Sequence, residues 1–172
     1  MQRPPALAAI PTAYSGCCLA LSKPLLDFIA TLLPPQPALV LSIGSGYGLL
    51  EAYLASNTYH LRIIGIEVAP SSNLYLPESQ HRLVHGSRFL EPLAADATTW
   101  LFVYPRRVGL VQEYLAAFED RNVDKIIWAG PHADWHDFKG CFTARWHAAL
   151  YNAGEVGGRA WELIAVLSKQ HA

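Results

Sequence analysis

The chain of 172 residues carries little charge and has no strong excess of either sign. Asp, Glu, Lys and Arg together make up 16% of it, the formal net charge is −1, and the only basic run is the pair Arg106-Arg107. Nucleic acids are bound largely through clustered basic side chains, so this composition argues against a nucleic-acid partner. No apolar run reaches the roughly 18 residues of a membrane-spanning helix, which argues against a membrane partner.

Cysteine is also scarce, and the three cysteines form no recognisable set. Cys17, Cys18 and Cys141 give neither an even number for disulfide pairing nor a CxxC motif, which favours a reducing compartment. The apolar segment that follows Met1 is broken by Pro11 and lacks the core of a signal peptide. These features predict a soluble protein of the cytoplasm or the nucleus.

The length and the hydrophobic content of 52% suit a single domain with a sizeable core. Residues 1–18 contain prolines and show no period, which predicts an irregular N-terminal arm. A helix is expected at 22–33, with Ser22 as its N-cap, and the core is expected at 38–169. Within this core, apolar runs predict strands at 38–43, 61–68, 82–86, 98–104, 123–129 and 160–167, and a period of 3.6 predicts a helix at 108–118.

The most informative stretch is a glycine-rich turn between a predicted strand and a predicted helix. The turn Gly44-Ser45-Gly46-Tyr47-Gly48 follows the first strand, and the next strand closes on Glu67. A nucleoside-binding βαβ unit needs this layout, because glycines allow a sharp turn and a close approach to a ligand, and an acid at the second strand tip accepts from ribose hydroxyls. The spacing from Gly44 to Glu67 is close to the roughly 20 residues expected of such a unit.

The glycine pattern distinguishes between nucleoside cofactors. Dinucleotide-binding folds use G-x-G-x-x-G, but the third glycine position counted from Gly44 is Leu49, and Gly48 comes one residue early. The pattern G-x-G-x-G, after an apolar strand and before a strand that ends in an acid, resembles the class I S-adenosylmethionine-dependent methyltransferases. The resemblance implies an α/β fold: a three-layer sandwich around a mostly parallel, twisted, seven-stranded sheet with an antiparallel C-terminal strand, the Rossmann-like methyltransferase fold.

The same resemblance implies a binding site for S-adenosylmethionine. In such enzymes the glycine turn lies against the methionine portion of the cofactor, and the acid that corresponds to Glu67 binds both ribose hydroxyls. The cofactor-binding residues expected on this basis are Ser42, Gly44, Ser45, Gly46, Gly48, Glu67, Val68 and Ser87.

The chain departs from the family pattern at two of these positions. Ser42 stands two residues before the first glycine, where the family often has an acid that helps to hold the cofactor's ammonium group. Ser87 stands where many members have an Asp that reaches the adenine amino group. At both positions a weaker contact with the cofactor is therefore expected.

Catalytic residues are harder to identify, because the sulfonium is already activated and the protein mainly positions and desolvates the reactants. Tyr104 ends the fourth strand, where it either orients an acceptor through its hydroxyl or simply closes the sheet. His132 and His136 follow the fifth strand. Their spacing is compatible with a metal site, with acid–base catalysis or with a polar structural loop, and we expect no bound metal.

The hypothesis that follows is an enzyme that transfers a methyl group from S-adenosylmethionine to an unidentified acceptor, a small molecule or a protein rather than nucleic acid. In related enzymes the segment before the first strand often contacts the acceptor, which makes Tyr14, Ser15 and Cys17 candidates. Two alternatives stay open. One is a catalytically inactive methyltransferase-like scaffold that binds a partner protein or a second copy of itself. The other is a nicotinamide-dependent reductase, which Leu49 disfavours.

Overall fold

The computed structural model of the protein describes residues 1–86 and 89–171. Its centre is a seven-stranded sheet in which β9 runs antiparallel to both of its neighbours, while the strands from β5 to β7 pair in parallel. The predicted mostly parallel sheet with an antiparallel C-terminal strand is thereby confirmed. In spatial order the strands are β5 (His81–Val84), β4 (Arg62–Val68), β3 (Leu39–Ile43), β6 (Thr99–Val103), β7 (Lys125–Pro131), β9 (Glu162–Lys169) and β8 (Trp146–Asn152).

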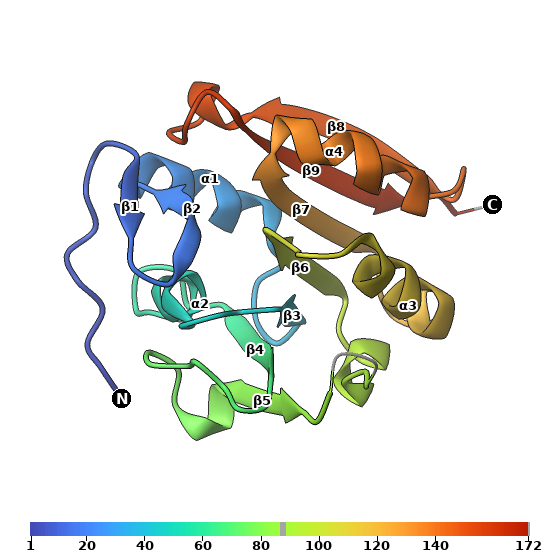
Figure 1. Ribbon diagram of the computed structural model, residues 1–172, viewed down its shortest axis with the longest axis horizontal. Coiled ribbons are helices and arrows are strands. Elements are labelled where there is room, and N and C mark those ends of the chain that lie inside the picture. Colours follow the sequence, from blue (N-terminus) through green and yellow to red (C-terminus); the bar gives the residue numbers. More distant parts are fainter. Residues whose placement is uncertain (87–88, 172) are drawn as a thin grey trace.

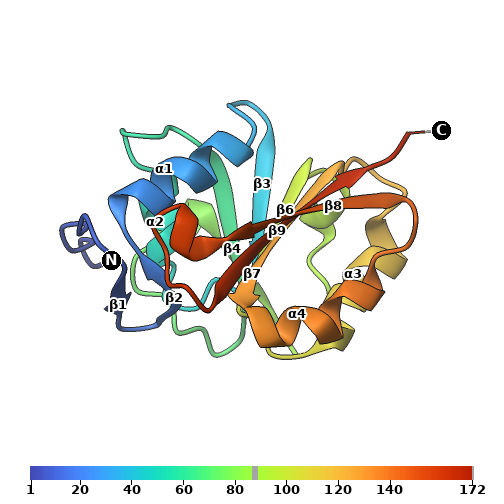
Figure 2. The same cartoon turned by 90° about the horizontal axis from the view of Figure 1, so that it is seen from above.

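Helices cover both faces of the sheet and complete the predicted three-layer sandwich (Figures 1 and 2). Every residue of β3 is buried, as expected of a parallel strand that is covered on both sides. Within the described ranges, none of the helices has the length and apolar character to cross a membrane. The helices α1 (Lys23–Leu32) and α2 (Leu49–Leu54) pack on one face, and α3 (Val108–Phe118) and α4 (His132–Phe138) on the other. The links also contain the 3-10 helices η1 (Glu78–Gln80), η2 (Pro92–Ala95), η3 (Lys139–Cys141) and η4 (Ala153–Glu155).

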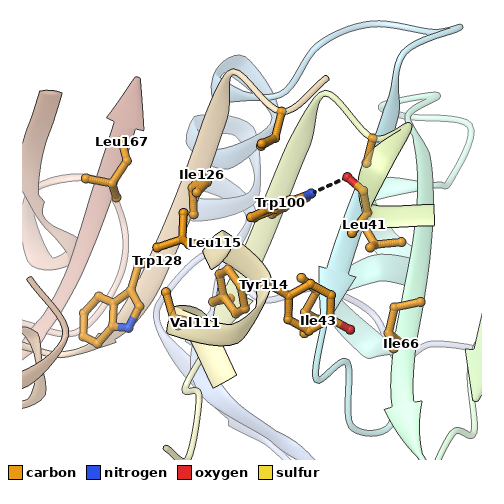
Figure 3. Close-up of a cluster of buried hydrophobic side chains, with 14 of the residues drawn as sticks. Leu41, Ile43, Ile66, Trp100, Val111, Tyr114, Leu115, Ile126, Trp128 and Leu167 are labelled. Atoms are coloured by element: carbon orange, nitrogen blue, oxygen red, sulfur yellow. Dashed lines mark hydrogen bonds between the residues drawn. The ribbon is translucent and has the colours of Figure 1, made fainter. Parts of the chain in front are cut away.

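Aromatic side chains fill the space between the sheet and α3 (Figure 3). Trp100 of β6 and Tyr114 of α3 are buried and meet edge to face, with ring centroids 6.0 Å apart. The indole N–H of Trp100 donates to the carbonyl of Ala94 at 3.1 Å, so its burial leaves no polar atom of the ring without a partner. Trp128 of β7 extends the cluster to Trp135 of α4. This packing holds α3 and α4 against β6 and β7, the two strands that follow β3 in the sheet.

The N-terminal segment differs from the predicted irregular arm over residues 1–18. Its strands β1 (Thr12–Tyr14) and β2 (Cys17–Leu21) form an antiparallel hairpin that lies beside α1 and α2 (Figure 1). Gly16 in the turn has a φ of 74°. Residues 19–21 are fully buried, so β2 lacks the alternation of apolar and polar residues that marks a half-exposed strand. The hairpin therefore leaves little periodic signal in the sequence.

Helix α1 begins as predicted, at a capping serine. Ser22 is fully buried, and its Oγ accepts from the N–H of Leu25 at 3.1 Å and donates to the carbonyl of Gly157 at 2.6 Å. One hydroxyl thus caps the helix and ties it to the link between β8 and β9.

Replacing this serine (Ser22→Ala) should lower the free energy of unfolding by about 1–2 kcal/mol, because the helix loses its cap and the Gly157 carbonyl loses its donor. Urea denaturation followed by circular dichroism measures the change. Ser79→Ala, at an exposed position of η1, is the control and should change stability by less than about 0.5 kcal/mol. An unchanged unfolding midpoint for Ser22→Ala would contradict the capping role.

Candidate functional site

A cavity of about 690 Å³ lies at the carboxyl ends of the parallel strands. Its walls come from the glycine turn after β3, the tips of β4 and β6, and the turn between β1 and β2. The strand order reverses between β3 and β6, and open α/β sheets bind their ligands at this kind of position. The volume suits a ligand of nucleoside size with a short extension.

The glycine turn adopts a backbone conformation that favours glycine. Gly44, Gly46 and Gly48 have φ values of 84°, 57° and 80°, in the left-handed region that strains other residues. A Cβ on Gly46 would lie 3.2 Å from the carbonyl oxygen of Gly16, whereas no described atom comes within 4 Å of a Cβ built on Gly44. Gly44 therefore presents bare backbone to the cavity.

Glu67, at the tip of β4, lies against this turn. Its Oε2 accepts from the N–H of Gly46 at 2.8 Å, and its Oε1 accepts from the N–H of Val68 at 2.9 Å. Both bonds fix the orientation of a half-buried carboxylate that lines the cavity. Each of its oxygens keeps a further lone pair, so the group can accept hydrogen bonds from two neighbouring hydroxyls of a ligand.

A second acid lines the cavity, and the sequence analysis missed it. Glu51 of α2 is 2% exposed, and its Oε1 accepts from the hydroxyl of the buried Ser42 at 2.5 Å. Its Oε2 is buried and meets no hydrogen-bond donor in the described part of the chain. Burial raises the pKa of Glu51 to about 7, although the bond from Ser42 lowers it. Ser42 itself lies behind this carboxylate rather than in the cavity wall.

Tyr104, directly after β6, lines the cavity with a left-handed backbone of φ 48°. This conformation is strained for tyrosine, and the N–H of Tyr104 supports it by donating to the carbonyl of Ala129 at 2.7 Å. The tyrosine hydroxyl donates to Oε2 of Glu162, a fully buried residue at the start of β9. Burial, together with this carboxylate, raises the pKa of Tyr104, so the hydroxyl is protonated at neutral pH.

The β1–β2 hairpin supplies another wall of the cavity. Gly16, Cys17 and Cys18 line it, and the ring of Tyr47 fills the space that a Cβ of Gly16 would occupy. Of the three residues in this segment that were expected to contact the acceptor, Cys17 lines the cavity, whereas Tyr14 and Ser15 do not. Burial, reinforced by the negative charge of Glu51, raises the pKa of Cys17 to about 12. Its thiol is therefore protonated at neutral pH and a poor nucleophile.

The cavity brings together most of the residues that were expected to bind a cofactor. Gly48 lies behind the wall instead, where a Cβ would come 2.7 Å from Cγ of Leu76. Ser87 lies outside the described residues. The binding roles themselves stay predictions. The expected residues found in the wall are Gly44, Ser45, Gly46, Glu67 and Val68.

Two of the expected catalytic residues lie elsewhere. His132 and His136 are exposed on α4 and take no part in the cavity wall. This helix buries Trp135 and Phe138 against the sheet, which turns the histidines toward solvent. Across residues 1–86 and 89–171, no group of three or more His, Cys, Asp or Glu side chains is arranged to hold a metal ion. The structure therefore gives these histidines no place in the candidate site.

The raised pKa of Glu51 predicts a pH-dependent cost to stability. The unfolded chain ionises this carboxyl near pH 4.5 and the folded chain only near pH 7, so its burial destabilises the fold progressively as the pH rises between these values. Glu51→Gln removes this effect. Relative to the wild type, the variant should gain up to about 3 kcal/mol in unfolding free energy between pH 4.5 and pH 7.5.

Urea denaturation at a series of pH values measures this difference. Glu78→Gln, at an exposed position, controls for the loss of one carboxylate. A constant difference between Glu51→Gln and the wild type over this pH range would contradict the description of Glu51 as a buried acid.

Several solved structures resemble this fold at low sequence identity. A LepI variant in complex with SAH and a substrate analogue gives a TM-score of 0.57 and 17% identity over 80% of this chain, which spans only 45% of that LepI chain. A predicted O-methyltransferase from Agrobacterium tumefaciens gives 0.60 and 11% identity, over 86% of this chain and 81% of that one. Precorrin-6y C5,15-methyltransferase from Geobacter metallireducens GS-15 gives 0.61 and 12% identity, over 98% of this chain and 100% of that one.

At the level of sequence, no protein-family model and no curated protein matches the chain. The likeness therefore rests on architecture: the strand order, the antiparallel β9 and the helices on both faces. Solved structures described as methyltransferases share that architecture over most of the chain. The chain has the Rossmann-like α/β fold of the class I methyltransferases.

Proposed function

We propose that the protein transfers a methyl group from S-adenosylmethionine to an acceptor that is a small molecule or a protein. The observation that carries this proposal is the pairing of bare backbone at Gly44 with the fixed carboxylate of Glu67 in one cavity at the ends of β3 and β4. The fold supports it, since LepI, which resembles this chain, has been solved with SAM and with SAH.

The residues around Glu67 fit the nucleoside part of this cofactor. Under this proposal both hydroxyls of a ribose donate to the Glu67 carboxylate, and the two backbone N–H groups that fix its orientation support this. Beyond it, the side chains of Val68, Val84 and Phe89 line the cavity near the tips of β4 and β5. Apolar side chains of this kind suit the faces of a planar base.

The tip of β6 fits an acceptor. When bound, S-adenosylmethionine supplies a methyl group that is already activated on a sulfonium, so the protein has to position the acceptor and exclude water. The hydroxyl proton of Tyr104 is committed to Glu162, which leaves the phenolic oxygen free to accept from an O–H or N–H of the acceptor. The exposed Arg106 also lines this part of the cavity and suits an anionic group on the acceptor.

Binding of nucleoside ligands tests the proposal directly. In isothermal titration calorimetry, SAM and SAH should bind the protein, and NAD should not. Binding of NAD alone would favour the nicotinamide-dependent reductase, and binding of none of the three would favour the inactive scaffold.

Glu67→Ala should weaken the binding of SAH by about 1–3 kcal/mol, because the ribose hydroxyls lose their accepting partner. Calorimetry on the purified variant measures the loss. Glu78→Ala, which removes an exposed carboxylate from the neighbouring η1, is the matched control and should bind as the wild type does. Equal affinities of Glu67→Ala and the wild type would show that the ribose lies elsewhere.

A further inference from the structure

Glu51 is a buried acid whose hydrogen-bonding capacity is only partly used. It is 2% exposed, Ser42 donates to its Oε1, and no described residue donates to its Oε2. No Lys, Arg or His in the described ranges forms an ion pair with it. A buried carboxylate that lacks a cationic partner and a donor to one of its oxygens lowers the stability of the fold. Its place in a cavity wall indicates that a ligand supplies the missing partner.

The groups that face Glu51 make its surroundings negative. Glu67 on β4 raises the pKa of Glu51, and Glu51 in turn raises that of Cys17 on β2, while Ser42 on β3 contributes only its hydroxyl. A cation bound at Glu51 would also be attracted by the negative charge of Glu67, and its own charge would favour the ionised form of Glu51. The part of the wall around Glu51 therefore favours a positively charged group.

The sequence position of Ser42 indicates which group this is. Ser42 lies at the strand position where the family often has an acid for the cofactor's ammonium group. The structure brings the carboxylate of Glu51 to the same place, because its Oε1 lies 2.5 Å from the Ser42 hydroxyl. Ser42 on β3 and Glu51 on α2 together stand where the family often has a single acid on the strand.

We propose that Glu51, held by Ser42, binds the α-ammonium group at the amino-acid end of the cofactor and so replaces the missing strand acid. This inference rests on the proposed function, since it concerns the same cavity. An ammonium group brings three donors and a full positive charge, and a bond from it to a carboxylate is among the strong ones. The amino-acid end of the cofactor then lies on the α2 side of the glycine turn, and the nucleoside end lies at Glu67.

Two ligands that differ only at the amino-acid end test this assignment. SAH carries the ammonium group, whereas 5′-methylthioadenosine has the adenosine and the sulfur without it. Glu51→Gln, which keeps the size of the side chain and an acceptor for Ser42, should bind SAH about 10- to 100-fold more weakly than the wild type in calorimetry. Its affinity for 5′-methylthioadenosine should change by less than about twofold.

Glu67→Gln is the matched control, because both ligands share the ribose and both should bind this variant more weakly. Equal losses for the two ligands in Glu51→Gln, or no loss for SAH, would overturn the assignment of Glu51. Failure of the wild type to bind either ligand would instead contradict the proposed function and, with it, this inference.

A count of released protons gives a second readout, independent of affinity. Because the pKa of Glu51 is raised to about 7, part of the protein carries this carboxyl protonated at pH 7, and the group becomes ionised when an ammonium group binds. SAH should therefore release a measurable fraction of a proton more from the wild type than from Glu51→Gln, and 5′-methylthioadenosine should release none from either. Titrations in phosphate and in Tris, which differ in heat of ionisation, measure this number. The same release from both proteins would contradict the role of Glu51.

Discussion

The site depends on the way in which the tip of β4 is joined to the turn after β3. The N–H groups of Gly44 and Ser45 both donate to the carbonyl of Ile66, at 2.9 and 3.0 Å, and the N–H of Gly46 donates to the Glu67 carboxylate at 2.8 Å. The left-handed turn that aims these N–H groups at β4 favours glycine. The result is a carboxylate of fixed orientation beside the exposed backbone of the glycine turn, at the ends of two parallel strands. The other walls of the cavity surround this pair.

Two acids, Glu51 and Glu67, line the cavity, and a third, the buried Glu162, contacts the cavity residue Tyr104. Glu67 accepts from backbone N–H groups, Glu51 accepts from the Ser42 hydroxyl, and Glu162 accepts from the Tyr104 hydroxyl. The cavity wall thus carries the acids Glu51 and Glu67 near the glycine turn and the basic residues Arg106 and Arg107 after β6. Such a wall suits a ligand that carries both signs of charge, and S-adenosylmethionine has a positive sulfonium, a positive ammonium group and a negative carboxylate.

The parts of the structure that the sequence predicted are those with a local cause. The buried strands are apolar runs and the turn before Glu67 needs its glycines, so both are visible in short windows. The hairpin around Gly16 is not visible in this way, because the buried part of β2 has no alternation of apolar and polar residues. Glu51 is missed for another reason: an acid in a helix reads as a solvent-exposed residue, and only the packing of α2 on the sheet shows that it is buried. His132 shows the opposite error: the sequence suggested a catalytic residue, but the structure places it on the side of α4 that faces solvent.

The central claim is that one cavity binds S-adenosylmethionine between Glu51 and Glu67. A crystal structure of the protein with SAH tests it most directly. The account predicts that the ribose hydroxyls lie within hydrogen-bonding distance of Glu67 and that the ammonium group lies against the carboxylate of Glu51. A ribose turned away from Glu67, or SAH absent from the cavity at saturating concentration, would contradict it.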